Sequence, residues 1–287
     1  MRHRLKLLLK PIARQLPIYR DLHREAYRLL GLYNSLSSRW NKQLRATAPI
    51  LLYHRVDMVN LDPQHLCVPP KIFAEHLAFL KQNYEVISLP RLVERVKHRA
   101  LTGREAVITF DDGYRDNFIN ALPILERYEL PATIYVTTGQ LGQRASFAWD
   151  MEYDEKDRAY FLSKTEINVL GKHPLIEIGA HTHNHSRLSD LSPQQQFEEM
   201  VKSKTILEEL IGRPVTSFAY PFGRVFDYNS ISTKQVKQIG FTHAVANTPQ
   251  LVTNASCLEA LPRFNIRACS VEILGQILLT KAISLQK

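Results

Sequence analysis

The chain has 287 residues, of which 45% are hydrophobic and 23% charged, an ordinary composition that excludes a fibrous or disordered protein. Its formal net charge of +9 lies entirely in residues 1–45, which hold 11 of the 37 Lys and Arg residues and only 2 of the 28 acids. A remainder without net charge argues against a nucleic-acid enzyme, which would carry basic charge around its active-site groove.

The first 47 residues predict a basic helical arm. Apolar residues recur at three- and four-residue steps between residues 18 and 33, while every fourth residue from Arg20 to Arg28 is arginine. Two interpretations stay open. The helix packs on the body of the protein with its arginines in water, or residues 1–33 lie on an anionic membrane surface.

The start of the chain also bears on location. Its apolar run, residues 7–9, is too short for a secretory signal, and no stretch reaches the ~20 apolar residues of a membrane span. We therefore expect a cytoplasmic protein, peripheral at the inner membrane face if the arm binds lipid. Three cysteines fit reduced thiols in that compartment.

Residues 48–287 read as one domain in which short apolar runs alternate with longer amphipathic segments. The predicted strands span 49–56, 84–89, 106–110, 132–137, 176–180, 217–220, 241–246 and 258–266. The predicted helices span 71–82, 89–98, 114–128, 165–170, 192–211, 233–239 and 271–283. This alternation predicts an α/β fold with parallel strands inside a ring of helices, closed as an irregular barrel. In such barrels the chemistry lies where the strands end at their carboxyl side.

The first chemical motif follows the predicted strand 106–110. Two adjacent carboxylates, Asp111 and Asp112, come directly after it, and Gly113 permits a sharp turn into the next helix. Neighbouring anions at a barrel mouth are costly unless a cation lies there, and a metal would engage one and leave the other free as a base. A helix N-cap is the alternative, although one Asp would suffice for it.

The second motif follows the predicted strand 176–180, where His181, His183 and His185 fall within five residues. His181 and His185 are close enough to share a metal, whereas His183 would point elsewhere in a helical turn. With one aspartate they make a three-ligand site with open positions, as catalytic zinc requires. The same ligands describe non-haem iron oxygenases. Those sites are typically carried on antiparallel barrels, whereas this chain alternates strand and helix.

Together the motifs resemble the polysaccharide deacetylase family, whose shared region is called the NodB homology domain. Thr-Phe-Asp-Asp-Gly at 109–113 and His-Thr-x-x-His at 181–185 match the family in order and separation, within a resemblance that runs from about residue 48 to 266. The style of the motifs is closest to exopolysaccharide and poly-N-acetylglucosamine deacetylase-like members. The resemblance implies a distorted (β/α) barrel with Asp111 as general base and a divalent metal, commonly zinc. The metal ligands that it implies are Asp112, His181 and His185.

A third family motif, Arg-x-Pro-Tyr-Gly, corresponds here to Ala-Tyr-Pro-Phe-Gly at 219–223. By the resemblance this segment shapes the substrate groove through Tyr220 and Phe222, and the backbone N–H of Phe222 helps to hold the oxyanion. The family's arginine, which orients the catalytic aspartate, is replaced by Ala219. We hypothesise that Arg263 substitutes for it from the last strand.

The family's late Leu-x-His motif, which supplies the general acid, is missing near 261–266. His54 ends the first strand of the domain and resembles the Tyr-His of the poly-N-acetylglucosamine subgroup, where this histidine is thought to protonate the leaving amine. His243 lies inside a strand pattern and is expected to be structural. We therefore assign the general acid to His54.

Trp149 and Asp150 follow the predicted strand 132–137 and resemble a loop of exopolysaccharide-type members. An aromatic ring beside an acid suits a sugar, whose faces stack on aromatic rings while its hydroxyls bond to carboxylates. Ordinary loop packing is the alternative.

These motifs predict a metal-dependent hydrolase that removes an acetyl group from a poly-, oligo- or lipid-linked saccharide, most simply the N-acetyl group of an amino sugar. The metal activates water, Asp111 accepts its proton and His54 protonates the leaving nitrogen. Two alternatives stay open: a catalytically impaired, carbohydrate-binding member, and a deacylase of small non-sugar amides. The sugar, the choice between N- and O-acetyl, the native metal and the oligomeric state are not fixed by the sequence.

Overall fold

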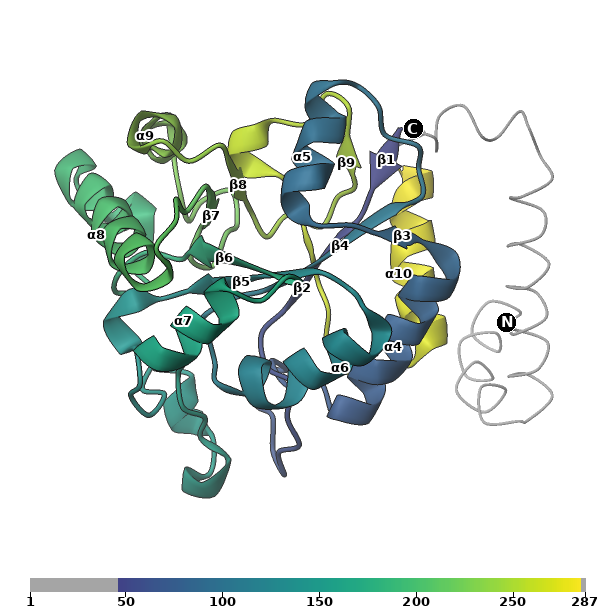
Figure 1. The fold of residues 1–287 in the computed structure, drawn as a ribbon, viewed down its shortest axis with the longest axis horizontal. Coiled ribbons are helices and arrows are strands. Elements are labelled where there is room, and N and C mark those ends of the chain that lie inside the picture. Colours follow the sequence, from purple (N-terminus) through teal and green to yellow (C-terminus); the bar gives the residue numbers. More distant parts are fainter. Residues whose placement is uncertain (1–45, 285–287) are drawn as a thin grey trace, which may run out of the picture. The chain divides into compact units, whose positions relative to one another are not determined.

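The computed structural model describes residues 46–284 (Figure 1). Residues 1–45 of the predicted basic arm, which spans residues 1–47, lie outside the described residues. No helix in the described part combines the length and the apolar character needed to cross a membrane.

A parallel sheet of eight strands forms the centre of the described chain (Figure 1). Along the sheet the order is β10-β2-β4-β5-β6-β7-β8, and β3 pairs with β4 beside this path. The strands are β2 (Ile50–Tyr53), β3 (Glu85–Val86), β4 (Glu105–Phe110), β5 (Ala132–Val136), β6 (Ile176–Ala180), β7 (Ser217–Ala219), β8 (His243–Val245) and β10 (Phe264–Asn265). All of their pairings are parallel, which confirms the predicted fold class.

The sheet curls into a distorted barrel that one short segment closes. The Leu261 N–H donates to the carbonyl oxygen of Ala244 in β8, and the Leu261 carbonyl oxygen accepts from the N–H of Ala246, just after β8. Three residues later, β10 pairs with β2. The same segment therefore joins both edges of the sheet. A separate antiparallel pair, β1 (Thr47–Ala48) with β9 (Val252–Thr253), adds two short strands.

Helices cover both faces of the sheet. They are α4 (Pro70–Asn83), α5 (Leu89–Lys97), α6 (Leu122–Tyr128), α7 (Lys164–Gly171), α8 (Pro193–Ile211), α9 (Ser230–Ile239) and α10 (Val271–Ser284). The largest apolar cluster joins α4, α6, α7 and α8 to the outer face of the strands, whereas α5 packs on the inner face with Ile50, Val107 and Tyr135. Buried on both faces, the strands are near-continuous apolar runs.

Local signals explain where the long helix α8 begins and ends. The Ser192 hydroxyl accepts a hydrogen bond from the backbone N–H of Gln195, and the Gln195 side-chain oxygen accepts one from the backbone N–H of Ser192. Pro193 occupies the first turn, where its missing N–H costs nothing. Gly212 closes the helix with φ of 70°, a left-handed conformation that glycine adopts without strain.

Several predicted elements differ from the structure, among them the following three. The strand predicted at 84–89 shortens to β3, because Ser88 caps α5 and turns the chain. The strand predicted at 258–266 is a 3-10 turn followed by β10. The helix predicted at 114–128 begins only at Asn117, with a π-helical turn in which the Leu122 N–H donates to the Asn117 carbonyl oxygen. Pro123 follows at once and has no N–H to extend a regular ladder backwards.

Candidate active site

Four of the parallel strands end on the same side of the barrel, and the polar residues that follow their carboxyl ends lie there. Asp111 and Asp112 follow β4, and His181 follows β6. His54 comes directly after β2, and Tyr220 directly after β7. Because neighbouring parallel strands present their carboxyl ends side by side, residues far apart in the chain become neighbours.

The buried side chains of Asp112, His181 and His185 form a candidate metal centre. The Asp112 Oδ1 atom lies 3.4 Å from the Nε2 atom of His181 and 3.2 Å from that of His185. One ligand atom from each residue lies within 4.8 Å of the others. These separations suit donors that surround one divalent ion at about 2.0–2.2 Å each. The predicted ligand set is therefore brought together, with two imidazoles and one carboxylate.

The backbone sets the orientation of the first histidine. The Nδ1 atom of His181 lies 2.8 Å from the carbonyl oxygen of Ala219, which can only accept a hydrogen bond, so Nδ1 carries the proton. The lone pair of His181 is then on Nε2, which faces Asp112. Ala219 thus contributes to the site through its main chain, whatever its side chain.

The charge state of Asp112 follows from its neighbours. Burial opposes ionisation, but interactions with the imidazoles of His181 and His185 outweigh it and hold the pKa of Asp112 well below its usual range. Asp112 is therefore a carboxylate, the form that binds a cation.

Backbone strain is concentrated around the same centre. Seven non-glycine residues have positive φ in the described chain, and four of them belong to the site. They are Asp112 (72°), Thr182 (61°), His185 (58°) and Phe222 (60°). A left-handed conformation costs free energy for residues with a Cβ and persists only where surrounding contacts hold it.

Arg263 binds the second aspartate. Its Nη1 and Nη2 atoms lie 2.7 and 2.6 Å from the two carboxylate oxygens of Asp111, and the guanidinium is fully buried. Burial raises the pKa of Asp111, but the charge of Arg263 lowers it further, so the pKa ends below its usual value. Thr109 accepts another hydrogen bond from Arg263, at 3.2 Å. The hypothesised contact between Arg263 and Asp111 is thus present, and its part in turnover stays a prediction.

The charges of the site act on the imidazole of His54. Burial lowers the pKa of its imidazole, while the negative charges of Asp112 and Asp111 raise it in opposition. Asn117 fixes the adjoining backbone, since its Nδ2 donates to the His54 carbonyl oxygen at 2.8 Å. The role of His54 as general acid stays a prediction.

Aromatic rings surround the exposed side of His185. The ring centroids of Phe147, Trp149 and Phe222 lie 4.9, 5.1 and 4.9 Å from that of His185. Phe222 is 37% exposed, and the Arg187 guanidinium covers its ring at 4.7 Å. Trp149 and Phe222 therefore line the approach to the metal ligands.

Two residues predicted to bind substrate lie in the interior instead. Tyr220 is 1% exposed and its hydroxyl donates to the Glu259 carbonyl oxygen at 2.7 Å. Asp150 is also 1% exposed, and its two oxygens accept from the Tyr114 hydroxyl at 2.8 Å and from the Phe147 N–H at 2.9 Å. Because both side chains are buried, the structure does not support direct contact of Tyr220 or Asp150 with a substrate. Asp150 instead fixes the loop that carries Trp149.

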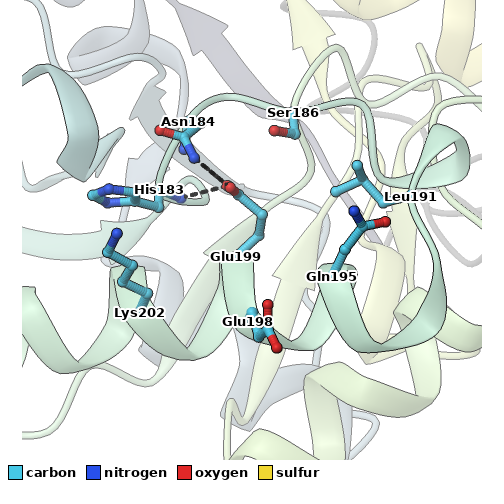
Figure 2. Close-up of a pocket in the computed structure, with 8 residues that line it drawn as sticks. All are labelled: His183, Asn184, Ser186, Leu191, Gln195, Glu198, Glu199 and Lys202. Carbon is cyan, nitrogen blue, oxygen red and sulfur yellow. Dashed lines mark hydrogen bonds between the residues drawn. The ribbon is translucent and has the colours of Figure 1, made fainter.

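One residue of the site carried no recognisable sequence motif. Glu199, on α8, binds the backbone of the loop from His181 to His185, here called the ligand loop (Figure 2). A depression of about 270 Å³ lies beside this loop, lined by residues of the loop, of α8 and of the segment between them. His183 belongs to that lining and is not among the metal ligands, and its Nδ1 lies 2.9 Å from the Thr138 hydroxyl.

Comparison with known proteins places this geometry in context. A family model described as polysaccharide deacetylase matches residues 98–244. A putative polysaccharide deacetylase of Bacillus subtilis, YxkH, is 29% identical over 233 residues, which cover 80% of this chain and 75% of that protein. The poly-beta-1,6-N-acetyl-D-glucosamine N-deacetylase of Staphylococcus aureus is 25% identical over 241 residues, which cover 77% and 79% of the two chains.

Solved structures of other proteins have a similar fold. The Streptococcus pyogenes deacetylase PplD, in complex with acetate, superposes with a TM-score of 0.68 at 25% identity, covering 83% of this chain and 99% of that one. The structure of IcaB from Ammonifex degensii, at 20% identity, has a TM-score of 0.66 over 84% and 98% of the two chains, and supports the fold alone.

Proposed function

The chain belongs to the polysaccharide deacetylase family of hydrolases, and from this premise we propose that it removes N-acetyl groups from an amino sugar within a saccharide, with zinc as its metal. The observation that carries the proposal is the buried group of Asp112, His181 and His185 next to an ionised Asp111. Two imidazoles and one carboxylate are a donor set that suits zinc. The name of the Staphylococcus aureus relative supports an N-acetylated amino sugar as substrate.

In the proposed reaction the residues of the chain divide the work. A divalent cation held by Asp112, His181 and His185 would supply Lewis-acid polarisation of the acetyl carbonyl and make water more acidic. Asp111 accepts a proton from the water that attacks the acetyl carbon, while Arg263 keeps its carboxylate ionised and oriented. His54 gives a proton to the departing nitrogen, so that the products are acetate and a free amine.

The entrance of the site supports a sugar as substrate. Trp149 and Phe222 meet edge to face, with ring centroids 5.8 Å apart, beside His185. Aromatic side chains offer flat apolar surfaces on which sugar rings pack. We infer that these two rings orient the acetamido group towards the metal ligands.

Acetate release from acetylated amino sugars, as oligomers, polymers and lipid-linked saccharides, tests the proposal. We expect release that a chelator abolishes and that added zinc restores.

Asp111→Asn should abolish release with the metal retained, and Asp154→Asn, the same change on an exposed loop, should not. His54→Ala should lower turnover by about 10²–10⁴-fold, the usual worth of a general acid, with the metal retained.

Other results would contradict the proposal in identifiable ways. Release only from O-acetylated saccharides would replace the N-acetyl assignment. Saccharide binding without acetate release would indicate an impaired member of the family, and release only from small non-sugar amides would indicate a different substrate class. Loss of the metal in His54→Ala would show that His54 holds the metal site together and is not the acid.

A further inference from the structure

We propose that Glu199 is a positioning residue that holds the ligand loop in the shape that binds the metal, an inference that rests on the metal centre of the proposed function. Glu199 lies on α8, outside the sheet, and its side chain reaches the loop at His183 and Asn184 (Figure 2). It touches neither Asp112 nor the two ligand imidazoles in any hydrogen bond found among the described residues. Its effect on the metal would therefore pass through the loop backbone.

The contacts of Glu199 are directed at two consecutive peptide groups. Its Oε2 atom accepts hydrogen bonds from the backbone N–H of His183, at 3.0 Å, and of Asn184, at 2.8 Å. Its Oε1 atom accepts a third from the Asn184 side chain, at 2.6 Å (Figure 2). Charge-assisted hydrogen bonds of this kind are stronger than neutral ones, and three of them fix both the position and the direction of the loop.

The ligand loop needs such support because of its backbone. Thr182 and His185 both have left-handed φ angles, of 61° and 58°, and neither is a glycine. The two peptides held by Glu199 lie between these two strained residues. Relaxation of either residue would rotate the adjoining ligand, His181 or His185, away from the shared centre.

The opposite side of the loop is held by main-chain contacts. In the 3-10 turn η2 (Thr138–Gln140), the N–H of Thr138 donates to the Thr182 carbonyl oxygen at 3.3 Å and that of Gly139 donates to the His183 carbonyl oxygen at 2.7 Å. The loop is therefore clamped between this turn and α8. Since the carbonyls bind the turn, Glu199 supplies the acceptors that the loop's N–H groups require.

The neighbouring residue offers a matched control. Glu198 lies on the same helix and lines the same depression, but its Oε1 atom accepts from the Gln194 side chain, at 2.8 Å. Among the residues drawn in Figure 2, no hydrogen bond joins Glu198 to the ligand loop. Glu198→Gln removes the same charge from nearly the same place without changing the clamp.

Binding of Co²⁺ to the metal-free full-length protein, followed by its visible absorption in competition with a chelator, tests the proposal. We expect Glu199→Ala to weaken Co²⁺ binding by about 10–100-fold, the usual effect of removing a group that orients metal ligands. Glu199→Gln should stay within about threefold of the wild type, because its amide oxygen can still accept from both backbone N–H groups. Glu199→Asp keeps the charge but is one methylene too short, so its Co²⁺ affinity should fall. Glu198→Gln should bind as the wild type does.

The outcomes separate this inference from its alternatives. If Glu199→Ala is less stable to urea yet binds Co²⁺ with wild-type affinity, Glu199 is merely structural and the proposal is wrong. If Glu199→Ala does not fold, normal binding by Glu199→Asp with weak binding by Glu199→Gln would overturn it, since charge and not hydrogen bonding would then matter. A wild type that binds Co²⁺ but releases no acetate overturns only the proposed function. A wild type that binds no divalent ion overturns both.

Discussion

At the scale of single residues, Arg263 binds Asp111 from the segment just before β10. The family motif places an arginine at position 219, where this chain has alanine. The carbonyl oxygen of Ala219 still orients His181, and the cation comes instead from Arg263, which binds both oxygens of Asp111. Position 219 therefore orients His181 through its main chain, and the hypothesis that Arg263, just before β10, takes over the task of the family's arginine stays a prediction.

We predict that Arg263→Ala lowers the turnover number by about 10²-fold or more while the metal content stays intact, because Asp111 would lose the partner that orients it. The variant should also unfold more easily, by about 3–5 kcal/mol, since a buried carboxylate would be left unpaired. Steady-state kinetics, metal analysis by mass spectrometry and urea unfolding measure the three effects. Arg263→Lys serves as the charge-retaining control, and unchanged turnover in Arg263→Ala would refute the assignment.

At the scale of elements, the ends of the strands and the turns that follow them build the site. Asp111 and Asp112 follow β4, and His181 follows β6. β5 leads into η2, whose N–H groups bind carbonyl oxygens of the ligand loop. Gly139 in that turn approaches the loop too closely for any side chain. A Cβ atom there would lie 2.6 Å from the His183 carbonyl oxygen and 3.0 Å from the Asn184 side-chain oxygen.

We predict that Gly139→Ala weakens Co²⁺ binding by about 10-fold or more, because the backbone oxygen it would meet belongs to the ligand loop and must move. The matched control is Gly275→Ala in α10, where the nearest atom, on the Phe79 ring, would be 3.5 Å away. There alanine should be tolerated and should raise the free energy of unfolding by up to about 1 kcal/mol through helix propensity. Equal Co²⁺ affinities for Gly139→Ala and Gly275→Ala would disprove the steric argument.

At the scale of the whole described chain, the candidate metal ligands and His243 lie at opposite ends of the strands. The metal ligands gather where the strands finish, whereas His243 lies at the start of β8, paired with Ser217 at the start of β7. Its Nδ1 atom is 2.8 Å from the Thr242 hydroxyl, and its Nε2 atom has no hydrogen-bond partner among the described residues. Burial, and then the charge of Lys97, lower the pKa of His243 to about 4. This placement agrees with the structural role expected for His243.

We predict that His243 makes the protein less stable in acid. In the unfolded chain its pKa is about 6.5, so between about pH 6.5 and 4 the unfolded state binds a proton that the folded state does not, and stability falls as the pH falls. Complete loss over this window amounts to about 3 kcal/mol, at 1.36 kcal/mol for each pKa unit. Urea unfolding between about pH 7.5 and 4.5 should show a shallower dependence for His243→Gln than for the wild type. Parallel profiles for the two proteins would contradict this prediction.

The predictions about location belong to this scale as well. The body of the chain has no net charge, and the basic residues that account for the +9 lie before residue 46. Contact of residues 1–33 with an anionic membrane, a lipid-linked substrate and a cytoplasmic location all stay predictions. Vesicle sedimentation of the full-length protein, with and without anionic lipid, would test the first.

The sequence alone determined the α/β class and the candidate metal ligands. Asp112 and His181 follow the apolar strands β4 and β6, and the chemistry of a parallel barrel gathers at the carboxyl ends of its strands, so the local pattern was enough to predict that they share a site, although β5 lies between the two strands. Only the tertiary structure decided that Arg263 reaches Asp111, that Tyr220 and Asp150 are buried, and that Glu199 holds the ligand loop. Each of these depends on a contact between residues distant in the chain. A strand or helix period specifies which face a side chain occupies, but not which partner from another element lies opposite it.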